Sequence, residues 1–197
     1  MKILCKPMGA FQTNCYIVVL KGGEIIIDPG VGATSWVLEN VKKPKAILNT
    51  HGHFDHTWSN AELKQKLKIP LYVPRDDVFM ITEDISNRGL TPSKPDVEYL
   101  PDEELEIAGE KIKFWHFAGH TPGCSSIQIE NVLFSGDFLF KDSIGRSDFP
   151  YSNTRDMKRS ILKVLNFKDD LIVYPGHGES TTLKAEQKNL PKWLNYI

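Results

Sequence analysis

The sequence predicts a protein of the α/β class with mixed β-sheets, and three observations lead to this prediction. Short runs rich in β-branched residues alternate along the chain with segments whose apolar residues recur at helical spacing. A Gly-Gly pair at 22–23 separates two of these runs, as in a β-hairpin. The 197 residues, of which 41% are hydrophobic, are enough for one domain with a sizeable core. We therefore expect a single domain over residues 1–197.

The elements of the N-terminal half follow from these patterns in order. The predicted strands are short apolar runs bounded by turns, at 14–20, 24–28, 46–50 and 69–74. The predicted helices have apolar residues at helical spacing, at 34–42, 57–68 and 76–83. The segment DISNRGLTPSKPD, residues 84–96, is polar and punctuated by proline, so it is expected to be a loop.

The C-terminal half continues the alternation. Residues 103–119 predict a second hairpin, and an amphipathic helix is expected over 154–167. Further strands are expected at 125–129, 132–137 and 170–178. The apolar tail LPKWLNYI could cover the core or meet a partner, so the sequence leaves the oligomeric state open.

Charge and hydropathy exclude several classes of protein. Lys plus Arg number 24 and Asp plus Glu number 25, with no long run of one sign, so we expect no nucleic-acid partner. No stretch approaches the ~18 apolar residues of a membrane span. The N-terminal MKILCKPMGAFQTN lacks the apolar core of a secretory signal. We expect a cytoplasmic protein with no membrane partner.

The three cysteines, Cys5, Cys15 and Cys124, are widely spaced and form no CxxC pair. This pattern favours reduced thiols over a disulfide framework or a zinc finger. Free cysteine is among the most buried residue types, so we expect Cys5 and Cys15 to be small buried residues. Cys124 directly follows the segment GHTPG and is expected to pack beneath it.

The segment NTHGHFDHT at 49–57 holds three of the six histidines and one aspartate: His51, His53, Asp55 and His56. Protonated imidazoles this close would repel one another, and their rings pack poorly in an apolar core. A bound metal ion removes both problems, because neutral imidazole and carboxylate are metal ligands. The segment therefore predicts a metal site.

Three more ligand-type side chains each follow a predicted strand. KFWHFAG leads to His120, VLFSG leads to Asp137, and LIVYPG leads to His177. Strands hold the loops at their ends rigidly, so an α/β scaffold can collect such residues in one place. Glycines beside these residues, at 52, 119, 136, 176 and 178, permit close approach of the backbone.

The segments HGHFDH, GHTPG, SGD and PGHG, in this order, resemble the metallo-β-lactamase fold superfamily, and the match runs from Asn14 to Gly178. The resemblance implies a four-layer αββα sandwich of two facing mixed β-sheets with outer helices. It also implies a metal site at one edge between the sheets. Carried over residue by residue, one ion would be held by His51, His53 and His120, and a second by Asp55, His56 and His177, with Asp137 bridging.

Imidazole and carboxylate ligands with open positions suit a catalytic site. Two divalent ions about 3.5 to 4 Å apart can share a hydroxide and lower the pKa of its parent water. We expect two divalent ions, with zinc first and iron or manganese as alternatives.

The segment GRSDF at 145–149 narrows the resemblance to the glyoxalase-II-like branch. It is similar to the GRTDF signature of the short hydrolases of that branch and of persulfide dioxygenases. Glyoxalase II itself has a lysine in place of Arg146, an aromatic residue in place of Asp148 and a tyrosine in place of Glu179. Only residues 178–197 follow the last histidine, so its glutathione-gripping helical extension is expected to be missing. We expect S-lactoylglutathione to be a poor substrate.

The predicted function is hydrolysis of a small anionic acyl thioester by a metal-bridging hydroxide. Two divalent ions carry +4, and Asp55, Asp137 and hydroxide subtract three, so about +1 remains to attract an anion and stabilise an oxyanion. Asp55 would also orient the hydroxide, so Asp55 and Asp137 are the expected catalytic residues. A thiolate leaves without prior protonation, which suits a site with no identified general acid.

Other functions stay open. A lactone could replace the thioester, or His51, His120 and Asp137 could form the two-histidine, one-carboxylate face of a mononuclear iron dioxygenase. A non-catalytic metal-binding protein is a third alternative. Antibiotic hydrolysis is disfavoured, because lactam-cleaving members with a cysteine at the second metal lack the bridging aspartate that SGD places here.

The remaining candidates are Arg146, His116 and three aromatic residues. Arg146 could bind an anionic substrate or orient Asp137, or it could pair with Asp148 and shape its own loop. His116 is expected to be a hydrogen-bonded wall residue. The aromatic residues Phe11, Phe54 and Phe138 could line the pocket or pack in the core.

Overall fold

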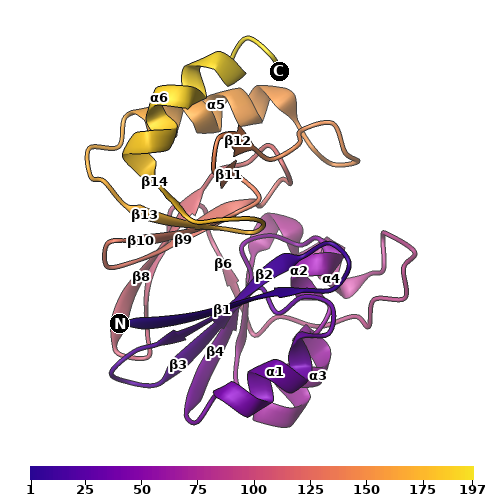
Figure 1. Cartoon of the computed structure of the whole chain (residues 1–197). Helices are drawn as coiled ribbons and strands as arrows, with labels where there is room; N and C mark the ends of the chain where they lie inside the picture. The colour runs from indigo at the N-terminus through magenta and orange to yellow at the C-terminus, as the bar shows by residue number, and fades with distance from the viewer.

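The computed structural model describes residues 1–197 and contains two six-stranded β-sheets that face each other, with helices on both outer sides (Figure 1). The first sheet has its strands in chain order. They are β1 (Lys2–Met8), β2 (Thr13–Val19), β3 (Glu24–Ile27), β4 (Pro44–Leu48), β5 (Leu71–Pro74) and β6 (Val97–Tyr99). The first three strands are antiparallel and β3 to β6 are parallel, so the sheet is mixed.

The second sheet has the order β14-β13-β10-β9-β8-β7. Its strands are β7 (Glu104–Ile107), β8 (Glu110–His116), β9 (Ser125–Ile129), β10 (Val132–Gly136), β13 (Ile172–Pro175) and β14 (Thr181–Thr182). Only β10 and β13 are parallel to each other. A separate pair, β11 (Leu139–Phe140) and β12 (Ser143–Ile144), lies beyond the end of β10.

Helices cover the outer face of each sheet. On the first sheet lie α1 (Ala33–Asn40), α2 (Phe54–Thr57), α3 (Asn60–Leu67), the 3₁₀ turn η1 (Arg75–Asp77) and α4 (Val78–Thr82). On the second lie α5 (Thr154–Leu165) and α6 (Leu183–Trp193), seen at the top of Figure 1. None of these helices is both long and apolar enough to cross a membrane.

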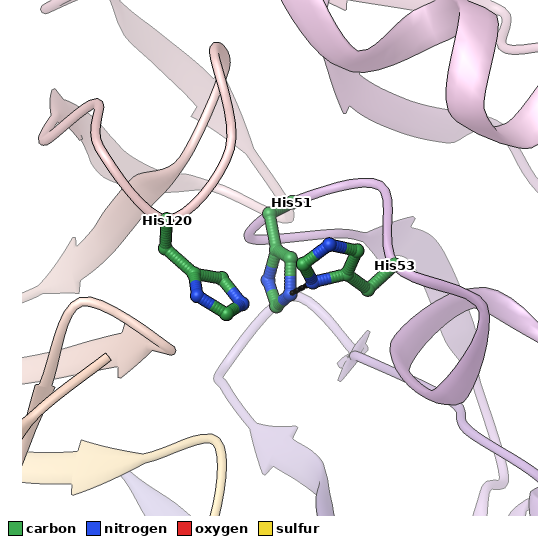
Figure 2. A group of neighbouring side chains, drawn as sticks. All are labelled: His51, His53 and His120. Atoms are coloured by element: carbon green, nitrogen blue, oxygen red, sulfur yellow. Dashed lines mark hydrogen bonds between the residues drawn. The ribbon is translucent and has the colours of Figure 1, made fainter. Parts of the chain in front are cut away.

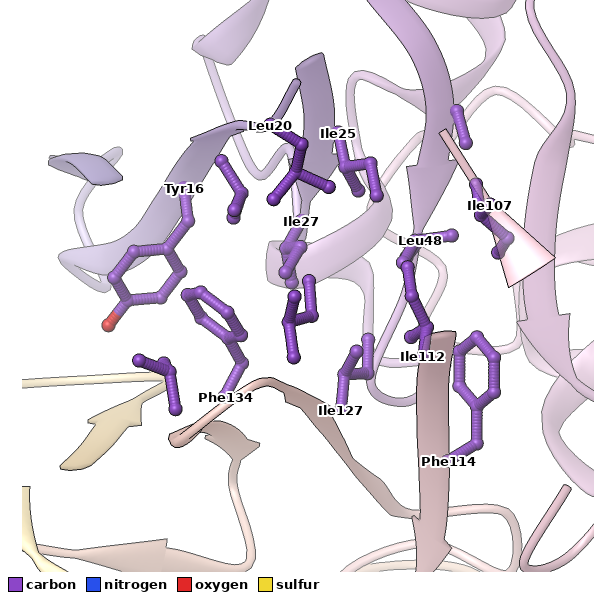
Figure 3. Packing of buried hydrophobic residues seen from close by; sticks show 14 of the residues in the cluster. Tyr16, Leu20, Ile25, Ile27, Leu48, Ile107, Ile112, Phe114, Ile127 and Phe134 are labelled. Carbon is purple, nitrogen blue, oxygen red and sulfur yellow. The ribbon is translucent and has the colours of Figure 1, made fainter. Parts of the chain in front are cut away.

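Alternate residues of the central strands face different layers. In β3, Ile25 and Ile27 belong to the cluster between the sheets, while Ile26 packs in the cluster beneath the helices. In β10, Phe134 faces the other sheet and Leu133 faces α5 and α6. Figure 3 shows the cluster between the sheets. Because both faces are buried, these strands appear in the sequence as unbroken apolar runs. The clusters between the sheets and beneath the helices on each side confirm the predicted four-layer αββα sandwich.

The helix expected over 57–68 is divided in the structure. Helix α2 ends at Thr57, and α3 begins at Asn60. Between them, the Ser59 backbone N–H donates to the carbonyl oxygen of Pro29 at 3.0 Å, and the Ser59 hydroxyl donates to that of Gly30 at 2.7 Å. These bonds tie the chain to the loop after β3, so two short helices replace one.

The burial expected for Cys5 is wrong, because Cys5 is exposed, whereas Cys15 and Cys124 are buried. Cys5 lies on β1, which pairs only with β2 and is therefore an edge strand. An edge strand that is mostly exposed tolerates lysine and Pro7, and it lacks the alternation that marks a half-buried strand.

Helix α6 was not expected from the sequence, which contains Pro191 near the end of the segment. The apolar tail packs against the core beneath the second sheet. Leu190 is buried there, and Trp193, Leu194 and Ile197 pack around the same cluster. Of the two alternatives for this tail, covering the core is confirmed.

Candidate metal centre

The loop after β4 brings four candidate ligands to the edge between the sheets. His51 is fully buried, and the short helix α2 places Asp55 and His56 in its first turns. Asp28, at the end of β3, fixes this loop: its carboxylate accepts from the Thr50 backbone N–H at 2.8 Å and the Thr50 hydroxyl at 2.6 Å. The same carboxylate lies 2.9 Å from Nδ1 of His56, which leaves Nε2 of that ring facing the site.

The second sheet supplies the other three candidates. Nδ1 of His120 lies 2.8 Å from the carbonyl oxygen of Arg146, and Nδ1 of His177 lies 3.0 Å from that of Phe11. A carbonyl only accepts, so each Nδ1 carries the proton and each Nε2 offers its lone pair to the site. Asp137 follows β10 directly. Backbone contacts therefore orient both imidazoles for metal binding.

The seven side chains form two groups with one carboxylate between them. In each group the ligand atoms lie within 4.8 Å of one another: His51, His53 and His120 in the first, and Asp55, His56 and His177 in the second. Figure 2 shows the three rings of the first group pointing toward one another. Asp137 Oδ1 lies 3.3 Å from Nε2 of His56, and Oδ2 lies 3.4 Å from Nε2 of both His120 and His177.

Three buried atoms at the centre have no hydrogen-bond partner: Nε2 of His56, Nε2 of His120 and Oδ1 of Asp137. Leaving a buried polar atom unpaired costs about 1–3 kcal/mol, so a native chain rarely leaves three together. Divalent ions would satisfy all three, because each atom is a metal ligand with a free lone pair. The donor set therefore fits metal ions at both groups.

Burial also sets the protonation of the first group. It lowers the pKa of His51 well below the ordinary value of 6.5, and it lowers the pKa of His53 to about 3. Both rings are therefore neutral at pH 7, which is the form that binds a metal. Burial disfavours charge on Asp137, but His56 and His177 outweigh it and hold the pKa of that carboxyl well below its ordinary value.

A second buried carboxylate, Asp77, joins the two loops of the first group. Its oxygens accept from the Gly52 backbone N–H at 2.9 Å, the Thr121 hydroxyl at 2.6 Å and the Gly123 backbone N–H at 2.6 Å. Gly52 lies between His51 and His53, whereas Thr121 and Gly123 follow His120. Asp77 therefore fixes the distance between ligands that come from different sheets.

A pocket of about 760 Å³ opens over both groups. Its walls include aromatic residues and two arginines, namely Phe11, Phe54, Phe140, Phe149, Tyr151, Arg88 and Arg146. Phe138 packs in the core instead. The guanidinium of Arg146 donates to both carboxylate oxygens of Asp148 at 2.8 Å. Of the two alternatives for Arg146, pairing with Asp148 is therefore the one that the structure shows. His116 is hydrogen-bonded as expected, with Nε2 2.9 Å from the Pro122 carbonyl oxygen, but it does not line this pocket.

Sequence reasoning missed Asp28, Asp77 and Arg88. Asp28 had a usable signal, because EIIIDPG ends a strand in a carboxylate as SGD does. Asp77 and Arg88 had none, since both lie in polar stretches where such residues are ordinarily solvated.

Comparison with known proteins agrees with this geometry. A family model described as Metallo-beta-lactamase superfamily matches residues 8–177. The chain is 32% identical to a hydroxyacylglutathione hydrolase GloC of Haemophilus influenzae, covering 97% of each chain. It is similar to the solved structure of BLEG-1 B3 metallo-beta-lactamase, with a TM-score of 0.88 and 32% identity over 98% of this chain and 99% of that one. It is also similar to TTHA1623 in a di-iron-bound form, with a TM-score of 0.82 and 31% identity over 96% and 99%.

Proposed function

This chain belongs to the metallo-beta-lactamase superfamily, and we propose that it uses two divalent ions to hydrolyse a small anionic acyl thioester. The observation that carries the proposal is the pair of three-ligand groups with the Asp137 carboxylate within 3.5 Å of imidazoles in both. A relative solved in a di-iron-bound form supports the count of two ions. Zinc remains our first choice of metal, with iron and manganese as alternatives.

The ions, when bound, supply a hydroxide at neutral pH and polarise the acyl oxygen. The chain's own residues orient the reaction. The Thr13 hydroxyl donates to Oδ2 of Asp55 at 2.7 Å and fixes that carboxylate in the second group. Asp55 can then accept the proton of a nucleophile that faces the pocket. The aromatic walls offer apolar surface to the part of the substrate attached to the acyl group.

A thioester is the best match to the leaving-group chemistry of this pocket. Its histidines belong to the two ligand groups, and its two arginines, Arg88 and Arg146, carry guanidinium groups, which do not give up a proton in proteins. Neither arginine can therefore protonate a leaving group. A thiolate needs no such proton, unlike an alkoxide or an amide nitrogen.

Hydrolysis of β-lactams is the second candidate. A solved structure described as a B3 metallo-beta-lactamase is 32% identical to this chain over 98% of its length. The GloC relative points instead to glutathione thioesters. The departures at Arg146, Asp148 and Glu179 lead us to expect a high KM for S-lactoylglutathione.

The test is a substrate panel run on protein loaded with zinc, iron or manganese. The panel holds small acyl thioesters, S-lactoylglutathione, a lactone, a β-lactam and a phosphodiester. We expect the highest kcat/KM for a small anionic thioester. Activity confined to the phosphodiester would sink the proposal, and a preference for the β-lactam would favour the second candidate. Efficient turnover of S-lactoylglutathione would overturn the expectation of a high KM for it.

Metal content is measured in parallel by elemental analysis. We expect close to two ions per chain, one ion in His56→Ala, and impaired binding of both ions in Asp137→Ala. His116→Ala is the matched control, because His116 is the one histidine outside the two groups, and it should keep both ions. A single iron retained by His56→Ala, with oxygen consumption on a persulfide, would favour the dioxygenase alternative.

A further inference from the structure

The pocket contains a positively charged side chain that no acidic residue neutralises. Of the two arginines in its wall, Arg146 is paired with Asp148 at 2.8 Å. The guanidinium of Arg88 has no carboxylate within 4.0 Å and donates no hydrogen bond to the protein. Arg88 therefore has all its side-chain donors free for a ligand.

Arg88 lies on two aromatic rings of the same pocket. Its guanidinium carbon is 4.7 Å from the ring centroid of Phe54 and 5.7 Å from that of Phe11. The two rings meet edge to face with centroids 5.3 Å apart. Contact with aromatic rings uses none of the N–H donors of a guanidinium in a conventional hydrogen bond, so these donors stay available for a planar anion.

The two rings are tied directly to the second ligand group. Phe54 immediately precedes Asp55, and the carbonyl oxygen of Phe11 accepts from Nδ1 of His177. The Arg88 side chain thus contacts two residues that are themselves joined to Asp55 and His177. A substrate whose acyl group lies at the ligands passes these rings before it reaches Arg88.

The backbone at Arg88 is fixed by one carboxylate. Asp84 accepts from the Arg88 N–H at 3.2 Å, the Gly89 N–H at 2.6 Å and the Ser86 hydroxyl at 3.0 Å. Gly89 has φ +84°, in the left-handed region that favours glycine. Leu90, next along, is buried. These contacts hold the segment so that Arg88 points over Phe54.

From these contacts we propose that Arg88 determines specificity by binding a carboxylate on the part of the substrate remote from the acyl carbon. The inference rests on the proposed function and deepens it: the substrate class is a thioester with an apolar stretch that crosses Phe11 and Phe54 and ends in a carboxylate. Arg88 positions this substrate and takes no part in bond breaking. Its loss should therefore raise KM and leave kcat nearly unchanged.

The first test compares two thioesters that differ only at the remote end, one with a carboxylate and one with the corresponding carboxamide. For Arg88→Gln we expect KM for the carboxylate to rise about tenfold and KM for the carboxamide to change less than twofold, since charge-assisted pairs are the stronger hydrogen bonds. Arg155→Gln is the matched control, because Arg155 lies on α5 outside the pocket. An equal change in KM for both thioesters would overturn the inference.

The second test does not depend on turnover. Calorimetry measures binding of 3-(benzylthio)propanoate and 3-(benzylthio)propanamide, which are thioethers that cannot be hydrolysed. The wild-type protein should prefer the carboxylate about tenfold, Arg88→Gln should lose this preference, and added salt should weaken it. No preference in the wild type, or a preference kept by Arg88→Gln, contradicts the role of Arg88. A preference that Arg88→Gln abolishes, in a protein that cleaves no thioester, contradicts only the proposed function.

Discussion

Two buried aspartates outside the seven predicted metal ligands, Asp28 and Asp77, support the centre through hydrogen bonds. Asp28 accepts from Thr50, whose hydroxyl lies 3.1 Å from Nδ1 of His51 in the first group, and contacts the ring of His56 in the second group. Asp77 bonds the backbone on both sides of the first group. Each carboxylate accepts several N–H or O–H donors, which offsets the cost of burying its charge. Substituting Asp77 should therefore lower the metal affinity of the first group more than that of the second.

The first prediction concerns Asp77→Asn. An amide has one acceptor oxygen, so its NH₂ must face either Gly123 N–H or the donors of Gly52 and Thr121. We expect metal affinity at the first group to fall about tenfold, as is usual when a support of the ligands is changed. Titration with zinc and a competing chelator measures this. Asp76→Asn, at the exposed neighbouring position, is the control, and equal affinities in the two variants would refute the prediction.

The same variant has a pH signature. Burial raises the pKa of Asp77 to about 6 from an ordinary 3.8, so between those pH values the folded chain binds more protons than the unfolded chain. The contribution to the free energy of unfolding is fully present below pH 4 and is lost as pH rises through 6, by up to about 3 kcal/mol. The stability difference between wild type and Asp77→Asn, measured by denaturant with chelator present, should shrink accordingly from pH 4 to pH 7.

The candidate metal ligands stood out in the sequence, whereas of their two supporting aspartates only Asp28 had a sequence signal, at the end of a strand. His51, His53 and His56 stand out because three histidines so close together have few other uses. Asp77 accepts backbone N–H groups, but in the sequence it looks the same as any aspartate in a polar turn. Arg88 was equally hidden, because only the structure shows that its partners are Phe11 and Phe54 rather than an acid.

At the scale of elements, the centre depends on how closely the strand ends approach one another. Gly176 follows β13, and its backbone N–H donates to the carbonyl oxygen of Gly136 at 2.8 Å. Its carbonyl oxygen accepts from the Asn14 N–H at 2.7 Å. A Cβ atom at position 176 would lie 2.1 Å from Oδ1 of Asp137 and 2.7 Å from Cε1 of His56. The glycine thus leaves the space that these two side chains occupy.

We predict that Gly176→Ala loses at least one metal ion, because the two backbone bonds prevent the strand end from moving away and the Asp137 carboxylate must shift instead. Gly178→Ala is the control in the same loop. Gly178 has φ +76°, so alanine there costs about 1 kcal/mol of strain, but its Cβ would meet nothing within 4 Å. Elemental analysis should find two ions in Gly178→Ala, and two ions in Gly176→Ala would contradict the steric argument.

The central elements could be predicted better than the peripheral ones. Strands β3 and β10 are buried on both faces, and the sequence shows them as apolar runs. Strand β1 is exposed at an edge, and β6 spans only Val97–Tyr99, so neither has a long enough pattern to recognise. Helix α6 was obscured by Pro191. Strands buried on both faces show a clear apolar pattern in the sequence. The elements that position the candidate ligands were therefore also the easiest to predict.

For the whole molecule, the ligands are divided between the two sheets. The loop after β4 in the first sheet carries four, and His120, Asp137 and His177 come from the second. Polar contacts already join the two sheets near the site, among them the Asn14 backbone N–H, which donates to the carbonyl oxygen of Gly176 at 2.7 Å. The Tyr16 hydroxyl donates to the carbonyl oxygen of Pro175 at 2.5 Å, and the Asn14 side chain donates to the same oxygen at 3.0 Å. Metal ions would add crosslinks between the sheets at the edge where the apolar core between them ends.

The last prediction is that metal removal destabilises the whole fold. An ion that binds only the folded chain stabilises it by about 4 kcal/mol at a free concentration 1,000 times Kd. For a chain of this size, 1 kcal/mol changes Tm by roughly 2–4 °C, so loss of one such ion should lower Tm by about 8–16 °C and loss of two by about 16–32 °C. Scanning calorimetry with and without EDTA measures the change. A variant with both His56→Ala and His120→Ala breaks both groups, so EDTA should leave its Tm unchanged. If EDTA leaves the wild-type Tm unchanged as well, the ions do not crosslink the sheets.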